Sequence, residues 1–254
     1  MRDITTIKYP SQEIAKKRRQ IAKSFVLNSP NVKSADIKQI SDRDLRLLFE
    51  LYDQVFFDSW FKECFPGTLK LSFSRRMTKS AGKTLYPYDA DPTRPESLVV
   101  EVRISVDFIL GYGALAEANK VGGIVTRSSL EALQVILEHE LVHVIEFFYF
   151  QQSSCKKERF KTMAQSLFGH TESCHRLATN QQIARRKLGF SIGDTVSFSC
   201  GGKRLEGVVH GIRKRATVMV RDEKGSFTDQ HGNRYAKYYV PLELLQAVPI
   251  VGGQ

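Results

Sequence analysis

The stretch ALQVILEHELVHVIEFFYF, residues 132–150, decides how this chain folds. It is apolar on almost every side of a helix, and Ser128 and Glu131 form a capping-box pattern just before it. We therefore predict a helix over residues 128–150. Because a helix that is apolar all round must be buried, the rest of the domain is expected to pack around it.

Three ionisable residues of this helix form an HExxH motif: His139, Glu140 and His143. The four-residue spacing puts both imidazoles on one face, about one turn apart, where they can reach one metal ion. Glu140 stands beside them and can accept a proton from water without binding the metal. Two core histidines and a salt-bridged glutamate are the alternative, but burying three such groups is costly unless they are paired or hold a metal. We interpret the motif as a Zn²⁺ site with Glu140 as the general base.

A catalytic zinc usually has three protein ligands and a water, so a third ligand is expected downstream. Glu146 and Tyr149 stand where a metzincin would have glycine and histidine, which excludes that class. A distant glutamate would suit a gluzincin, and Glu158 and Glu172 are the candidates.

His170 is the third ligand that we predict. It follows Gly169 at a break between two expected helices, where a side chain can turn back toward the buried helix. His175 is the alternative.

The four cysteines are scattered, with no CxxC pair, which argues against a zinc ribbon and against a disulfide framework. We interpret all of them as reduced thiols. Cys174 is close in sequence to the proposed metal site, and we interpret it as a small buried hydrophobic residue.

The net charge of +11 is unevenly distributed. Residues 1–40 hold nine Lys/Arg against three acids, residues 41–189 hold twenty against eighteen, and residues 190–254 hold nine against six. Such basic ends suit contact with DNA, whose phosphates bind lysine and arginine, although solvated ends that aid solubility are the alternative. The two densest clusters supply the predicted nucleic-acid contacts: Lys16, Lys17, Arg18, Arg19, Arg213, Lys214 and Arg215.

Membrane and secretory segments are not expected. No apolar run approaches the ~18–20 residues of a membrane helix, and the first residues lack the apolar stretch of a secretory signal. We therefore expect an intracellular protein with no membrane partner.

The chain is expected to have an α+β fold in three parts. Residues 1–40 form a basic arm, residues 41–189 the metal-binding domain, and residues 190–254 a small SH3-like β-barrel with short alternating strands and glycine turns. Around the central helix we predict a helix over 42–65, an antiparallel sheet, and two later helices that end at Gly169 and Gly189. The sheet strands are 68–77, 82–89 and 97–110, and the later helices are 156–167 and 172–187.

Over residues 44–188 the sequence resembles the SprT-like family, which includes the Spartan proteases that digest proteins crosslinked to DNA. The resemblance rests on LRLLFELYDQVFFDSWF (45–61), on Ala81-Gly82, on HELVH (139–143) and on Gly169-His170. It implies a zinc peptidase with a helical core and a small sheet beside the cleft, where an extended substrate could add a strand. It also implies His170 as the third zinc ligand, because the family places that histidine in a Gly-His-Gly segment.

Two features depart from the family pattern. Thr171 replaces the glycine that often follows the third histidine. Many members carry a zinc ribbon after the core, whereas this chain has its β module there and no cysteine pairs.

The expected function is zinc-dependent hydrolysis of protein substrates, including proteins associated with or crosslinked to DNA. The alternative is a nucleic-acid-binding or adaptor protein whose peptidase core is structural or self-cleaving. A zinc hydrolase that is not a peptidase is less favoured, because HExxH with a distant third histidine is mostly a peptidase arrangement.

Overall fold

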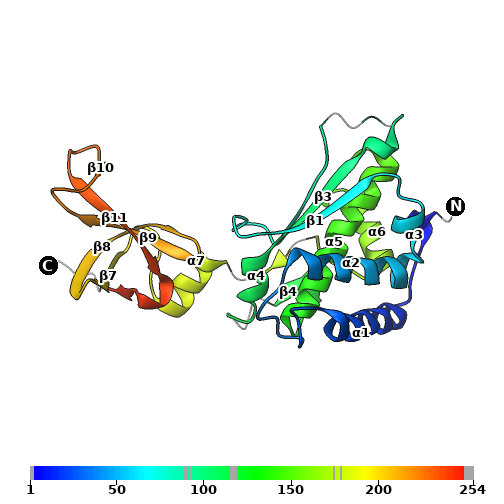
Figure 1. Ribbon diagram of the computed structural model, residues 1–254, viewed down its shortest axis with the longest axis horizontal. Coiled ribbons are helices and arrows are strands. Elements are labelled where there is room, and N and C mark those ends of the chain that lie inside the picture. Colours follow the sequence, from blue (N-terminus) through cyan, green and yellow to red (C-terminus); the bar gives the residue numbers. More distant parts are fainter. Residues whose placement is uncertain are drawn as a thin grey trace. The chain divides into compact units, whose positions relative to one another are not determined.

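The computed structural model describes residues 3–88, 91, 93–114, 119–173, 175–177 and 179–248. The fold is mixed α and β, as predicted from the sequence, and it divides into two compact units, Met1–Leu177 and Ala178–Gln254 (Figure 1). The division falls before the boundary at 189/190 predicted from the sequence, because residues 184 and 190 are buried in the core of the second unit.

The first unit combines helices with two small three-stranded sheets. Its described helices are α1 (Ser11–Asn28), α2 (Asp42–Phe57), α3 (Trp60–Glu63), α4 (Val106–Leu110), α5 (Ser129–Phe150) and α6 (Glu158–Phe168). Its strands are β1 (Thr68–Ser74), β2 (Gly82–Leu85), β3 (Val99–Ser105), β4 (Lys120–Val121), β5 (Ile124–Val125) and β6 (His175–Arg176).

Helix α5 confirms the prediction made from residues 128–150. Ser128 caps it by accepting the Glu131 N–H at 3.2 Å, and Gln151 ends it in a left-handed conformation, with φ of 53°. The helix contacts α1, α4 and α6 as well as strands β2 and β3 (Figure 1). Its apolar side chains are thereby buried from Leu130 to Phe147, whereas Phe150 at its C-terminal end is 41% exposed.

The main sheet has the order β1-β3-β2 and is mixed. β2 pairs antiparallel with β3, but β1 pairs parallel with β3, from Thr68↔Val99 to Ser74↔Ser105. The predicted all-antiparallel sheet is therefore wrong for β1. β3 is the central strand, and its alternate residues Val100, Val102 and Ile104 are completely buried. β2 is an edge strand and lies next to α5.

The predicted basic arm is not an appendage, because α1 packs into the first unit. Ile14, Ile21 and Phe25 of α1 belong to the same hydrophobic core as α5. The Gln134 side chain of α5 also donates to the Arg18 carbonyl at 3.1 Å. The apolar residues of this segment recur at helical spacing, so the helix buries one face and leaves the charges of the other face exposed.

The helix predicted over 42–65 is interrupted after Phe57. Asp58 and Ser59 adopt left-handed conformations, with φ of 51° and 65°, and the short α3 follows. The Asp53 carboxylate accepts the N–H groups of Phe61 at 2.8 Å and Lys62 at 3.0 Å, which caps α3 and stabilises the break.

The helix predicted over 172–187 is wrong in its first half. Strand β6 lies there and pairs antiparallel with β4, and α7 (Asn180–Ile183) begins only after it, followed by a π-helical segment, Ala184–Leu188. Gly169 and Gly189 do end helical segments, with φ of 69° and 77°. Cys174 and the end of the predicted 82–89 strand lie outside the described residues.

The second unit is dominated by one antiparallel sheet of order β10-β11-β9-β8-β7-β12. Its strands are β7 (Thr195–Cys200), β8 (Lys203–Ile212), β9 (Arg215–Arg221), β10 (Phe227–Thr228), β11 (Arg234–Pro241) and β12 (Gln246–Ala247). Alternating apolar residues of β7, β8, β9 and β11 form a separate core, as the alternating pattern predicts.

Across the described ranges, no helix has both the length and the apolar character that a membrane crossing requires.

Candidate metal centre

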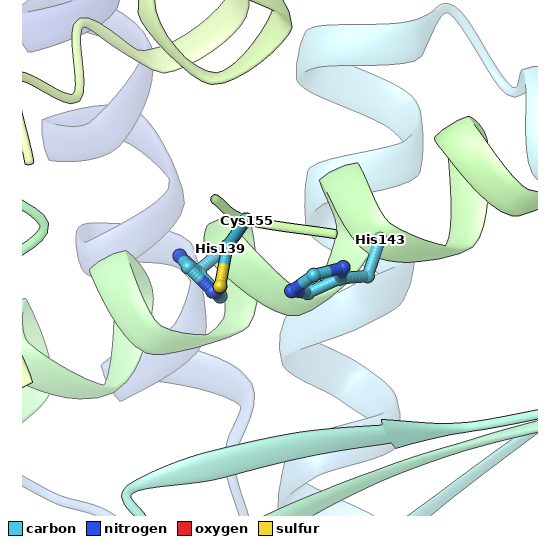
Figure 2. A group of neighbouring side chains, drawn as sticks. All are labelled: His139, His143 and Cys155. Carbon is cyan, nitrogen blue, oxygen red and sulfur yellow. The ribbon is translucent and has the colours of Figure 1, made fainter. Parts of the chain in front are cut away.

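His139, His143 and Cys155 form a group that could hold a metal ion. Each residue offers one ligand atom, and these three atoms all lie within 4.8 Å of one another. Figure 2 shows both imidazoles projecting from α5, with Cys155 on the segment that follows the helix. The site is therefore assembled from one helix and the turn that leads away from it.

The geometry of the chain explains how the three residues meet. His139 and His143 lie one turn apart on α5, with ring centroids separated by 5.0 Å. Gln151 then ends the helix in a left-handed conformation, and the chain reverses before α6 begins at Glu158. This reversal brings Cys155 back to the histidines.

Phe160 of α6 forms an apolar wall behind the two imidazoles. Its ring centroid is 4.8 Å from that of His139 and 4.3 Å from that of His143, and its side chain is fully buried. Close packing of this kind restricts the rotamers of the histidines and keeps their ligand atoms directed toward the same point.

A chain of hydrogen bonds fixes the orientation of His143. The Ser153 hydroxyl donates to Glu146 Oε2 at 2.7 Å, and His143 Nδ1 lies 2.6 Å from the same hydroxyl oxygen. Because the single Ser153 proton goes to Glu146, Nδ1 must carry a proton and donate it to Ser153. The other nitrogen, Nε2, then has the lone pair that a metal ligand needs.

The Glu146 carboxylate is held in turn from its other side, where Arg159 Nε donates to Oε1 at 2.8 Å. Burial lowers the pKa of His143 to about 4, against a smaller opposing effect from the Glu146 charge. His143 is therefore neutral near pH 7, which is the state required for metal binding.

Glu140 is buried beside strand β2. Thr84 Oγ1 donates to Glu140 Oε2 at 2.7 Å, and a methyl group in place of the Gly82 hydrogen would collide with Oε1. Gly82 thus leaves the space that the carboxylate occupies. Burial raises the pKa of Glu140 to about 7, in spite of the hydrogen bonds from Thr84, and a pKa near the working pH suits a general base.

Cys155 is partly buried and is not part of a disulfide. Burial raises the pKa of its thiol, and the nearby Glu140 and Glu146 charges act in the same direction. A bound cation reverses this preference, because a thiol that coordinates a metal is deprotonated. Two imidazoles and one thiolate are a donor set that suits zinc, so the residues fit this metal.

The structure does not bring His170 to His139 and His143. His170 Nε2 lies 2.9 Å from Glu138 Oε2, on another side of α5. Glu138 also accepts hydrogen bonds from Arg18 and, at 2.7 Å, from the Tyr52 hydroxyl. His170 therefore belongs to a buried polar network, and Cys155, rather than His170, is grouped with His139 and His143 among the described residues.

The other downstream candidates do not join the group. Glu172 forms an ion pair with Lys120 at 2.6 Å, and Glu158 is exposed in the first turn of α6. The side chain of His175 lies outside what the structure describes, as Cys174 does.

Two of the four predicted nucleic-acid contacts in α1 are engaged within the protein. Arg18 pairs with the buried Glu138, and Lys17 Nζ donates to the Val55 carbonyl at 2.6 Å. Lys16 and Arg19 are exposed. In the second unit, the predicted contacts are exposed at the turn from β8 to β9: Arg213, Lys214 and Arg215.

Cys155 is the candidate ligand that sequence reasoning missed. Because the sequence has no CxxC pair, all four cysteines were interpreted as reduced thiols. A single thiol on the segment directly after an HExxH helix was the available signal, because a chain reversal there returns it to the helix face.

No protein-family model matches the chain, and comparisons with curated proteins and with solved structures find no significant match. The class of protein must therefore be argued from the site itself.

Proposed function

We propose that the chain is a zinc-dependent peptidase in which His139, His143 and Cys155 hold the metal and Glu140 is the general base. The observation that carries the proposal is the convergence of three ligand atoms within 4.8 Å, next to a buried carboxylate whose pKa is raised to about 7. A structural zinc site would normally be closed by four protein ligands. The described residues supply three, which leaves a position for water or substrate.

Zinc, when bound, would activate a water molecule and polarise the scissile carbonyl. Glu140 accepts the proton of the attacking water and then delivers it to the nitrogen of the leaving amine. Thr84 holds Oε2 of this carboxylate by a hydrogen bond, so Oε1, opposite Gly82, is the oxygen that exchanges the proton. The Ser153–Glu146–Arg159 chain keeps His143 in the tautomer that can bind metal.

An extended polypeptide is the substrate that the surroundings favour. β2 is an edge strand of the main sheet and runs beside Glu140, so a substrate strand pairing with β2 would pass close to the general base. The resemblance to the SprT-like family supports the same class of substrate and extends the proposal to proteins associated with or crosslinked to DNA. In that reading the second unit, with its antiparallel sheet, is an SH3-like barrel in the place of the family's zinc ribbon.

Metal analysis of purified variants tests the proposal. Wild-type protein is expected to contain about one zinc per chain, and His139→Ala, His143→Ala and Cys155→Ala are expected to lose it. Cys200→Ala, an exposed thiol in the second unit, is the matched control and should retain the metal. Retention of zinc by Cys155→Ala together with loss in His170→Ala would contradict the proposed ligand set.

Substitution of cobalt for zinc gives a readout that is independent of activity. Coordination by Cys155 predicts a thiolate-to-cobalt charge-transfer band that disappears in Cys155→Ser. If the wild-type cobalt protein lacks this band, Cys155 is not a ligand.

A further inference from the structure

The sheet of the second unit has one face that is turned away from its core. On β9 the residues Ala216, Val218 and Val220 are buried, so the alternate residues point outward. The register places Arg221 opposite Tyr235, Met219 opposite Lys237 and Thr217 opposite Tyr239 on β11, and Tyr235 opposite Phe227 on β10. We call this surface the aromatic–basic face; it consists of Arg215, Arg221, Phe227, Tyr235, Lys237 and Tyr239.

Large apolar side chains are exposed on this side of the sheet. Tyr239 is 64% exposed and Phe227 is 41% exposed. Val208 of β8, which is opposite Met219 of β9, is 43% exposed. Three of the five large hydrophobic residues that are exposed in the described part of the second unit thus lie on one sheet face. Clustered exposure of this kind marks interaction surfaces, whereas single exposed residues are ordinary.

Positive charge is interleaved with these rings. The Lys237 ammonium lies 3.8 Å from the centroid of the Phe227 ring, and Arg221 is directly opposite Tyr235. The outward positions of β9 and β11 carry three cations and no carboxylate. Four acids lie nearby. Glu206 points outward on β8, Asp222 and Glu223 follow Arg221 in the turn after β9, and Asp229 accepts a hydrogen bond from the Tyr235 hydroxyl at 2.9 Å.

The charge of the whole unit agrees with that of the face. Residues 178–254 contain twelve lysines and arginines against six acidic residues, so an anionic partner is favoured. An acidic peptide would satisfy the charges but would not need flat rings. A nucleic acid uses both, because its phosphates bind cations and its bases stack on aromatic side chains.

We propose that the aromatic–basic face binds single-stranded nucleic acid. Bases stack on Tyr239 and Phe227, and Arg215, Arg221 and Lys237 contact the phosphates. Unpaired bases are required because a duplex keeps its base faces stacked inside the helix. Tyr235 and Tyr239 are four residues apart on β11, or about 13 Å, so the face accommodates a short run of nucleotides. This proposal is independent of the proposed peptidase activity.

The test is fluorescence anisotropy of the full-length chain with a labelled oligothymidylate across a salt series. A duplex of equal length and unlabelled polyglutamate serve as competitors. Tyr239→Ala and Phe227→Ala are each expected to lower affinity by about five- to a hundred-fold without changing the salt slope, because stacking carries no charge. Lys237→Gln is expected to lower the log–log salt slope by about 0.7, as one phosphate contact is lost.

Leu244→Ala is the matched control, because Leu244 is 60% exposed but lies in the short helical turn Leu242–Leu244, outside the aromatic–basic face. The affinity of Leu244→Ala for the oligothymidylate should equal that of the wild type. Thermal melting of each variant shows whether the fold is kept. Unchanged affinity in Tyr239→Ala and Phe227→Ala, tighter binding of the duplex, or equal competition by polyglutamate would each overturn the proposal.

Discussion

Two sides of α5 each have a buried carboxylate with histidine nearby, Glu138 on one side and Glu140 on the other. The two carboxylates differ in the hydrogen bonds that they accept. On one side, Glu138 accepts hydrogen bonds from Arg18, Tyr52 and His170. On the other side, Glu140 Oε2 accepts a hydrogen bond from the Thr84 hydroxyl. Ligand atoms of His139, His143 and Cys155 lie within 4.8 Å of one another nearby.

The pKa values follow the same division. Burial alone would raise the pKa of Glu138, but Arg18 and His170 outweigh it and hold this pKa below its ordinary value. Burial controls Glu140 instead and raises its pKa to about 7. Glu138 is thus a permanent anion in a closed network, whereas Glu140 can gain and lose a proton near neutral pH. Two similar residues of one helix thus have opposite pKa shifts, because Glu138 is paired with Arg18 whereas burial dominates at Glu140.

The largest effect is expected from Glu140→Gln. The amide keeps the shape of the carboxylate and should leave the zinc in place, but it cannot accept the water proton. Cleavage of an unfolded protein substrate should fall by about 10²–10⁴-fold, as measured by the rate of product formation. Glu158→Gln, at an exposed position in α6, is the control. Undiminished cleavage by Glu140→Gln would place the general base elsewhere.

In the Glu138 network, Arg18→Met should reduce the stability of the fold and leave the candidate metal site intact. Removing one partner of a buried ion pair leaves Glu138 uncompensated, which typically costs about 3–5 kcal/mol. Urea unfolding measures the loss, and zinc content should remain at the wild-type level. Arg19→Met, at the exposed neighbouring position, should change stability by less than about 0.5 kcal/mol. A stable Arg18→Met protein would show that this network contributes little.

Ser153→Ala tests the contact that orients a candidate ligand, because Ser153 connects His143 to the buried Glu146 carboxylate. His143 Nδ1 would lose the oxygen to which it donates, and zinc affinity should fall by about 10–100-fold in chelator competition. Ser154→Ala is the matched control, since Ser154 contacts Glu146 through its backbone N–H. Equal zinc affinity in the two variants would argue against a role for this tautomer.

The smallest effect concerns Asp44, a buried carboxylate in the first turn of α2. Burial raises its pKa, but hydrogen bonds from Ser29, Ser41 and Asn31 outweigh this and lower it to about 2. A depressed pKa stabilises the fold above the unfolded value of about 3.9, and this contribution disappears as pH falls toward 2.

Asp44→Asn should therefore be less stable than the wild type at pH 7, by about 1–2 kcal/mol in urea unfolding, and the difference should shrink between about pH 4 and pH 2. A difference that persists unchanged at pH 2 would mean that the charge of Asp44 does not matter. Asp36→Asn, at an exposed position, should show no such pH dependence.

Several features could be predicted from the amino-acid sequence alone: the central helix, its cap at Ser128, the glycine termini at 169 and 189, and the alternating strands of the second unit. These features are local, because apolar periodicity and capping chemistry act within a few residues. The pairing of His139 with His143 was equally readable, since helical geometry alone places residues four apart on one face.

Long-range packing sets which distant residues contact those of α5, and this could not be predicted from the sequence. His170 and Cys155 were both available downstream, and the chain reversal after Gln151 brings Cys155 to the histidines while His170 pairs with Glu138. It likewise decided that Arg18 of α1 is engaged within the protein and that β1 is parallel to β3. The physical reason is that such contacts depend on how whole elements pack, which no local spacing in the sequence specifies.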